Sequence, residues 1–285
     1  MPIQNFLIKG NIKLKLARNT AFALFVSVTL SAISGTAFAA NRLEKILEAG
    51  KLTVCTAPHF APYEFIDNTK KGQERFRGSD IKLTHYIAEK LGVEVEITPL
   101  EFSAVLAAIT QGKHDLAISA LSYTPARAKT IELSDPYKKG DEEGVLVRKA
   151  DADKYKSWDD FDGKTVGANT GTLQEQLISL CLPKAKKQTF DMPGIAVVAV
   201  SSGKIDAAAV AVPQGEMFVK SNPDLCVLPL RFDQVKSGYV IGATKGEVEL
   251  IARVNEIIKE VVDNGLYDKW LEEAESEVKE FKPEK

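Results

Sequence analysis

The chain has 285 residues and a formal net charge of −2, because 37 basic residues nearly balance 39 acidic ones. A mildly acidic chain whose charges are scattered has no electrostatic footprint for nucleic acid or for an anionic lipid surface. We therefore expect no nucleic-acid partner, and the length allows one large or two small domains.

The first 39 residues are interpreted as a signal peptide. Basic residues come first, and the apolar run at 21–34 is shorter than the roughly 20 residues that a membrane-spanning helix needs. Ala37, Phe38 and Ala39 then match a signal peptidase site. We expect cleavage after Ala39, which removes four basic and no acidic residues and changes the net charge from −2 to −6. An uncleaved anchor helix is the alternative.

Helix and strand patterns alternate through the first half of the remaining chain. The clearest helix, at 78–92, begins with a Ser-Asp cap, carries leucine and isoleucine at i, i+4 spacing, and stops at Gly92. Strands are predicted at 52–57, 93–98 and 115–119, and further helices at 41–50 and 102–112. This alternation is typical of βαβ units in a parallel sheet.

The same alternation restarts in the second half and predicts a second lobe. Strands are expected at 163–169, 187–190, 205–212 and 239–244, and helices at 171–181, 194–203 and 251–265. The strand at 239–244 is interpreted as the return to the first lobe. We expect lobe 1 to comprise 40–138 and 245–285, and lobe 2 to comprise 139–244, with two crossover segments between them.

One segment, at 112–137, places polar groups at the C-terminal end of a strand. The strand 115–119 is followed by hydroxyl residues, and Thr124-Pro125 then opens a helix that carries Arg127. In open α/β sheets ligands bind at the C-terminal ends of strands, and a guanidinium can grip a carboxylate by two parallel hydrogen bonds. Arg127 is therefore the first candidate ligand-binding residue, and an exposed arginine on a helix surface is the alternative.

Several blocks in this order resemble the periplasmic solute-binding proteins of family 3, which serve ABC importers of polar amino acids. The resemblance covers nearly all of the chain after residue 39, and the blocks that carry it are APYEF at 61–65, GSDIKL at 78–83, the segment 112–137, DGKTVGANTGT at 162–172, SGKIDAA at 202–208 and NGLYDKW at 264–270. It implies a two-lobed α/β periplasmic-binding-protein fold of type II, in which each lobe is a mostly parallel sheet flanked by helices.

The resemblance also implies a function. The protein would be a periplasmic, monomeric component of an ABC importer that captures an amino acid or related small carboxylate and presents it to the membrane permease, without a cofactor. Closure would occur about 137–140 and 239–244. An exported enzyme similar to cyclohexadienyl dehydratases is the alternative, and a ligand-sensing receptor domain is a third.

The resemblance assigns individual residues to the site. Arg127 would bind the ligand carboxylate beside Ser119 and Ser122. From the other lobe, Gly171 and Thr172 would close on the same carboxylate at a helix N-terminus, which attracts anions. The ring walls of the site would be Phe60 and Phe102.

Three positions depart from the family pattern. Ala211 stands where an aspartate usually pairs with the ligand ammonium, Ala57 stands where an acid often meets a basic side chain, and Leu173 is apolar. Because an unpaired buried ammonium is unfavourable, a basic ligand is disfavoured, and we expect either a neutral amino acid or an acid without an ammonium.

Other chemistries find little support. The sequence Gly163-Lys164-Thr165 ends like a P-loop, but Trp158 occupies the place of its first glycine. No metal site is expected, because the three histidines, His59, His85 and His114, lack zinc-ligand spacing. The acidic residues Asp67, Asp80 and Glu89 are interpreted as surface residues. Cys55 is interpreted as a buried strand residue, whereas a disulfide between Cys181 and Cys226 is left open.

Overall fold

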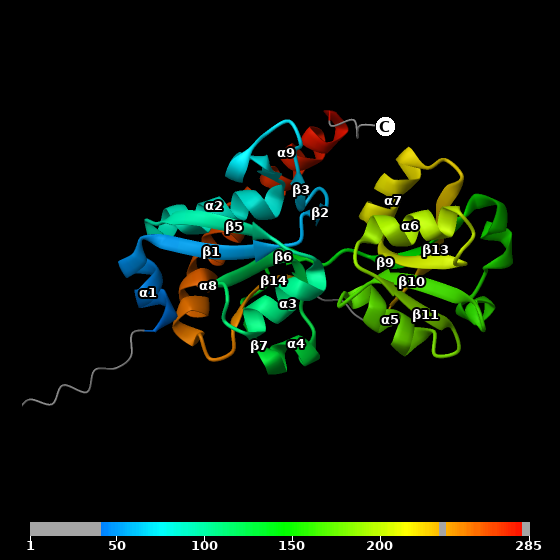
Figure 1. The fold of residues 1–285 in the computed structure, drawn as a ribbon, viewed down its shortest axis with the longest axis horizontal. Helices are drawn as coiled ribbons and strands as arrows, with labels where there is room; N and C mark the ends of the chain where they lie inside the picture. The colour runs from blue at the N-terminus through cyan, green and yellow to red at the C-terminus, as the bar shows by residue number, and fades with distance from the viewer. Residues whose placement is uncertain (1–40, 234–237, 281–285) are drawn as a thin grey trace, which may run out of the picture. The chain divides into compact units, whose positions relative to one another are not determined.

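The computed structural model describes residues 41–233 and 238–280 and contains two α/β lobes, each with its own sheet (Figure 1). This architecture confirms the predicted fold class. The predicted signal peptide at 1–39 lies outside the described residues. Among the described helices, none combines the length and the low polarity needed to cross a bilayer.

The first lobe is built on a six-stranded mixed sheet. Its spatial order is β5 (Glu94–Pro99), β1 (Lys51–Thr56), β6 (Leu116–Ser122), β14 (Gly238–Thr244) and β7 (Ile131–Leu133), with β8 (Lys138–Lys139) paired to β14. Strands β5, β1 and β6 run parallel, because helices α2 (Ser79–Leu91) and α3 (Phe102–Thr110) connect strands and return the chain to the same edge. The returning strand β14 is antiparallel to β6.

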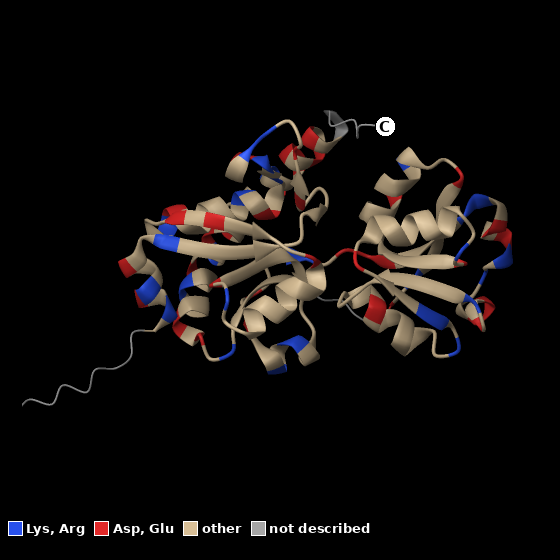
Figure 2. Cartoon of the chain, viewed as in Figure 1, with Lys and Arg blue, Asp and Glu red and all other residues tan. Residues whose placement is uncertain are grey.

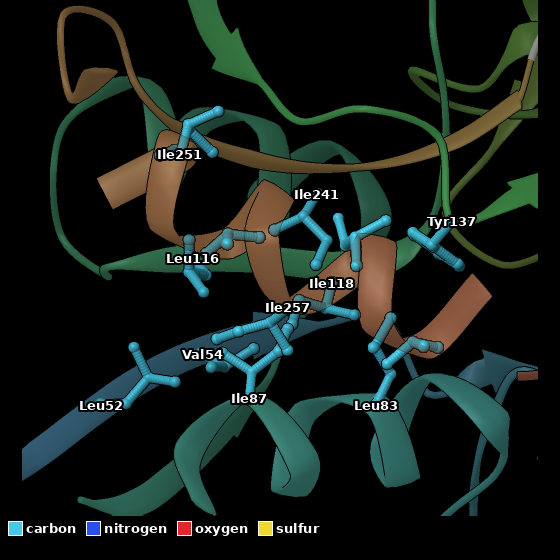
Figure 3. Close-up of a cluster of buried hydrophobic side chains, with 14 of the residues drawn as sticks. Leu52, Val54, Leu83, Ile87, Leu116, Ile118, Tyr137, Ile241, Ile251 and Ile257 are labelled. Atoms are coloured by element: carbon cyan, nitrogen blue, oxygen red, sulfur yellow. The ribbon is translucent and has the colours of Figure 1, made fainter. Parts of the chain in front are cut away.

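Helices with well-defined ends cover this sheet. Helix α1 (Arg42–Ala49) starts with a capping box between Asn41 and Glu44 and ends at Gly50, whose left-handed backbone (φ 64°) suits glycine. The C-terminal helices α8 (Val248–Asp263) and α9 (Leu266–Glu280) pack with α2. Figure 3 shows the resulting core, in which side chains such as Val54, Ile118 and Ile257 fill the space between sheet and helices.

The second lobe has a five-stranded sheet of its own. Its spatial order is β11 (Lys186–Phe190), β10 (Thr165–Asn169), β12 (Ala207–Ala211), β9 (Glu143–Arg148) and β13 (Leu225–Arg231). Helices α5 (Leu173–Cys181), α6 (Pro193–Ser201) and α7 (Val212–Ser221) pack against it. Sequence patterns predicted β10, β11, β12, α5 and α6, but not β9, β13 or α7.

Smaller elements complete the fold. They are a three-stranded sheet of β2 (His59–Phe60), β3 (Glu64–Ile66) and β4 (Phe76–Arg77), helix α4 (Pro125–Thr130), and 3₁₀ turns at Gly72–Arg75, Lys149–Lys154 and Trp158–Phe161. Strand β3 is important for the site, because it carries Glu64 into the interior.

The predicted lobe boundary needs one correction. Strand β14 was included in lobe 2 by the limit at 244, but all of its pairing partners belong to the first sheet. Gly238 pairs directly with Lys139, so the chain leaves and rejoins the first sheet on neighbouring strands.

The start of α2 also differs from the prediction. Gly78 is the N-cap, with φ 121°, and makes no side-chain cap hydrogen bond. Asp80 is completely buried rather than at the surface, and Asp67 is buried as well, whereas Glu89 is exposed as expected. The local sequence pattern could not show that Asp80 is buried, because its hydrogen-bond partners come from distant parts of the chain.

Acidic and basic residues are mixed over both lobes (Figure 2). Cys55, Cys181 and Cys226 are free thiols. Within 41–233 and 238–280, no group of three or more histidine, cysteine, aspartate or glutamate side chains is arranged to hold a metal ion.

Candidate ligand-binding cleft

A cleft lies where the strand ends of the two lobes face one another. Its volume, including the open mouth, is about 740 Å³, which is within the range of small-molecule sites. The first lobe supplies Ala57, Phe60, Glu64, Phe102, Ser119, Ser122 and Arg127 to the lining, and the second supplies Asn169, Thr172, Leu173, Gln174, Ala209 and Gln214.

Arg127 provides the positive charge of this cleft. Thr124 caps α4 and accepts from the Arg127 N–H, which orients the first helical turn, and the side chain is only 6% exposed. Its Nη1 donates to the Ser122 carbonyl at 2.6 Å and its Nη2 donates to the Gly171 carbonyl at 2.8 Å. Among the described residues Nε has no hydrogen-bond partner. Within 41–233 and 238–280, the guanidinium therefore has carbonyl partners but no carboxylate partner to balance its charge.

Two aromatic rings of the first lobe, Phe60 and Phe102, line the cleft. The Arg127 guanidinium lies over the Phe102 ring, 5.4 Å from its centroid, an arrangement in which the ring face attracts the cation. Phe60 also lines the cleft and packs on Tyr63 with a centroid distance of 5.1 Å.

The turn before α5 differs from the predicted anion site. The Gly171 N–H donates to the Glu175 carboxylate and the Thr172 N–H to the Asn169 carbonyl. The Thr172 hydroxyl is occupied as the helix cap, since it accepts from the Glu175 N–H. The Gly171 carbonyl of this turn accepts a hydrogen bond from Arg127. The N–H groups of Gly171 and Thr172 already have partners, so they are not available to bind an anion.

Ser119 is linked to a buried carboxyl that the sequence analysis did not single out. Its hydroxyl donates to Glu64 Oε1 at 2.8 Å and accepts from the Ala57 N–H at 3.0 Å. Glu64 is 1% exposed, and its Oε2 has no hydrogen-bond partner in the described part of the chain. Only the block APYEF pointed to this residue, and a glutamate in a short strand gives no local sign that it is buried.

Glu64 lies close to Asp80, and the two carboxyls interact. Asp80 accepts hydrogen bonds from the Ala120 N–H and from the Tyr137 and Tyr267 hydroxyls, at 2.6, 2.8 and 2.6 Å. Burial raises the pKa of both acids, and the Asp80 charge raises the pKa of Glu64 further. Three donors stabilise the ionised form of Asp80 and oppose the rise of its pKa, whereas only the Ser119 hydroxyl does so for Glu64.

The second lobe has a comparable arrangement. Glu143, at the start of β9, is 4% exposed, and burial raises its pKa to about 8. The Gln174 side-chain nitrogen donates to Glu143 Oε2 at 2.8 Å. Neither residue was predicted, because β9 was not recognised and Gln174 follows an ordinary helix cap.

Ala211, which was predicted to be a site residue, lies behind the lining. It is buried opposite Glu143 in the strand ladder, while Ala209 and Val210 reach the cleft. Gln214 does reach it and donates to the His59 carbonyl of the other lobe at 3.3 Å.

The lining contradicts the argument that the cleft lacks acids. Glu64, Glu101 and Asp191 all line it, although none could be inferred from the alanines at 57 and 211. A cationic group can therefore find a carboxylate here.

Comparison with known sequences identifies a family. The sequence profile of the bacterial extracellular solute-binding proteins, family 3, matches residues 52–273. An arginine-binding extracellular protein of Bacillus subtilis is 30% identical over 78% of this chain and 86% of its own. A probable histidine-binding protein of Campylobacter jejuni is 28% identical over 90% of this chain and 98% of its own.

Solved structures agree with this match. An amino acid ABC transporter substrate-binding protein of Streptococcus pneumoniae, bound to L-arginine, superimposes with a TM-score of 0.75 at 35% identity, covering 81% of this chain and 97% of that one. A more distant relative is the cyclohexadienyl dehydratase of Pseudomonas aeruginosa, 22% identical over 70% of this chain and 75% of its own.

Proposed function

The chain belongs to the bacterial extracellular solute-binding proteins, family 3, and we propose that it captures a cationic α-amino acid such as arginine and presents it to an ABC importer. The observation that carries the proposal is the buried guanidinium of Arg127, whose partners are two carbonyls. A buried charge is stable when it is paired, and a ligand carboxylate would supply that pair.

The cationic side chain is inferred from the other charges of the cleft. Apart from the buried Glu64, the acids Glu101 and Asp191 line the cleft with a single arginine among the described residues, Arg127, and His59 Nε2 lies 3.9 Å from Glu101. A zwitterionic ligand brings one charge of each sign, so a second positive group on the ligand would balance the acid that Arg127 leaves unbalanced. The rings of Phe60 and Phe102 would pack along such a side chain. The relatives named for arginine and histidine support this choice, which replaces the expectation of a neutral ligand.

Titration calorimetry against a panel of amino acids tests the proposal. Arginine should bind more tightly than leucine or glutamine, and Arg127→Ala should weaken binding by about 2–5 kcal/mol, the scale for removing one partner of a buried charge pair. The matched control is Arg253→Ala, because Arg253 contacts Glu256 and the Lys90 carbonyl on the helical side of lobe 1. Unchanged affinity in Arg127→Ala would refute the assignment.

An enzyme on the same scaffold is the second candidate. Burial raises the pKa of Glu143 to about 8 and that of Glu64 well above its usual range. A dehydratase needs such a carboxyl as a general acid, and the Pseudomonas relative carries that name. Incubation of the purified protein with prephenate and with arogenate distinguishes an enzyme from a binding protein. Recovery of unchanged substrate supports a binding protein, and multiple turnovers would establish an enzyme.

Export and partner complete the proposal. Cleavage after Ala39 would give a periplasmic monomer that meets the membrane permease when its lobes are closed. Mass spectrometry of the exported protein should find Ala40 as the first residue, and a full-length product in the membrane fraction would contradict cleavage.

A further inference from the structure

Asp141 lies in the first crossover segment, between β8 and β9, and its carboxylate is held by groups of the first lobe. Its Oδ2 accepts hydrogen bonds from the hydroxyls of Tyr63 and Tyr239, at 2.7 and 2.9 Å. Its Oδ1 lies 2.9 Å from the Lys138 ammonium, and the Asp141 side chain is only 7% exposed. Three donors therefore stabilise a charge that is almost completely removed from solvent.

The two tyrosines form one compact unit with this ion pair. Their rings meet edge to face, with centroids 5.3 Å apart. The Lys138 ammonium lies over both rings, 5.4 Å from the centroid of Tyr63 and 5.3 Å from that of Tyr239. Burial and the Asp141 charge raise the pKa of both hydroxyls, so each keeps its hydrogen and remains a donor.

This unit supports one wall of the cleft. Tyr239 lines the cleft directly, and so does Phe60. The Phe60 ring rests on the Tyr63 ring, with centroids 5.1 Å apart, and Tyr63 is buried behind it. Because Asp141 fixes the hydroxyl end of Tyr63, it limits where the Phe60 ring can lie.

The residue that follows Asp141 is held by the other lobe. The Glu142 carbonyl accepts from the Val212 N–H at the start of α7, at 2.8 Å, and Glu143 begins β9 in the second sheet. Adjacent residues of this crossover are thus anchored to different lobes. A rotation of the lobes along this crossover must therefore turn the backbone between the Asp141 side chain and the Glu142 carbonyl.

We propose that Asp141 is a positioning residue for solute capture, which holds the aromatic wall of Phe60 and Tyr239 through two tyrosine hydroxyls and joins this wall to the point where the lobes rotate. The inference rests on the proposed function, because it requires a solute side chain that packs against Phe60. Asp141 itself is not among the residues that line the cleft. Loss of its carboxylate should therefore weaken binding without removing an atom that touches the solute.

A double-mutant cycle tests this role, with affinity for L-arginine measured by titration calorimetry and stability measured by urea unfolding. The variants are Asp141→Asn, Tyr63→Phe and their combination. Each single variant should weaken binding by about tenfold, the scale of one charge-assisted hydrogen bond. The combined variant should lose much less than the about hundredfold that independent effects would give, because both substitutions disrupt the same hydrogen bond.

A second unit of tyrosine, carboxylate and lysine supplies the matched control on the helical side of lobe 1. The Tyr86 hydroxyl donates to Glu260 Oε1 at 2.7 Å. The Lys90 ammonium lies 2.6 Å from the same oxygen and 5.1 Å from the centroid of the Tyr86 ring. Glu260→Gln and Tyr86→Phe should retain wild-type affinity, whatever their effect on stability.

The outcomes separate this role from a structural one. A structural role alone would lower the stability of Asp141→Asn and Tyr63→Phe and leave their affinity unchanged. That result, or affinity losses that simply multiply, would overturn the inference and leave the proposed function intact. A wild-type protein that binds no amino acid would overturn both. Tyr63→Phe removes one hydroxyl and keeps the ring, so its affinity decides the question if Asp141→Asn does not fold.

Discussion

Replacing Asp80 with alanine should strongly destabilise the first lobe. The carboxylate is completely buried and accepts from the Ala120 N–H and from the hydroxyls of Tyr137 and Tyr267. A buried donor left unpaired costs about 1–3 kcal/mol, and Asp80→Ala leaves three. Relief of the repulsion with Glu64 offsets part of this, so we expect a loss of about 3–5 kcal/mol.

Urea unfolding at pH 7 measures this loss. Asp80→Asn keeps an acceptor and a similar shape, so it should lose only about 1–2 kcal/mol. Glu89→Ala is the control on the same helix, because Glu89 is exposed, and it should stay within about 0.5 kcal/mol of the wild type. If Asp80→Ala unfolds within about 1 kcal/mol of this control, the assigned role of the hydrogen-bond cluster is wrong.

Three further predictions concern the backbone and pH. Ala120 has a left-handed backbone with φ 40°, so Ala120→Gly should be neutral or stabilising by up to about 1 kcal/mol in thermal unfolding, whereas Ala117→Gly in the same strand should destabilise; equal losses would contradict this. A side chain at Gly78 would meet the Tyr63 carbonyl at 2.1 Å, so Gly78→Ala should cost more than about 3 kcal/mol by urea unfolding. Since the folded protein holds the Glu143 proton more tightly than the unfolded chain, stability should fall as pH rises from about 4.5 to about 8; Glu143→Gln should flatten this dependence, and an unchanged curve would refute it.

Local pattern was sufficient for much of the fold. The glycine stop at Gly92 and the spacing of apolar residues predicted their elements, because each depends on neighbours in sequence. Strand β9 was missed because it opens with Glu143, directly after Glu142, and its apolar part is short. Only its central place in the second sheet, between β12 and β13, makes it a strand.

The candidate site was predicted unevenly for a similar reason. Arg127 follows a strand, hydroxyls and a Thr-Pro cap, and all of these signals are local. Glu64 and Asp80, in contrast, are buried by contacts with Ser119 and with tyrosines more than 50 residues away. The alanines at 57 and 211 led to the prediction of a cleft without acidic residues. That prediction was wrong, because Glu101 and Asp191 line the cleft from other parts of the chain.

The chain leaves the first sheet at Lys139 and rejoins it at Gly238, and these two residues are direct partners in the ladder. The second lobe is therefore an insertion with adjacent ends, and it contains separate hydrophobic clusters of its own. The first lobe, in contrast, needs β14, α8 and α9 to complete its core. During synthesis these elements emerge after the whole insertion, so the lobe that begins the chain should be the last to finish folding.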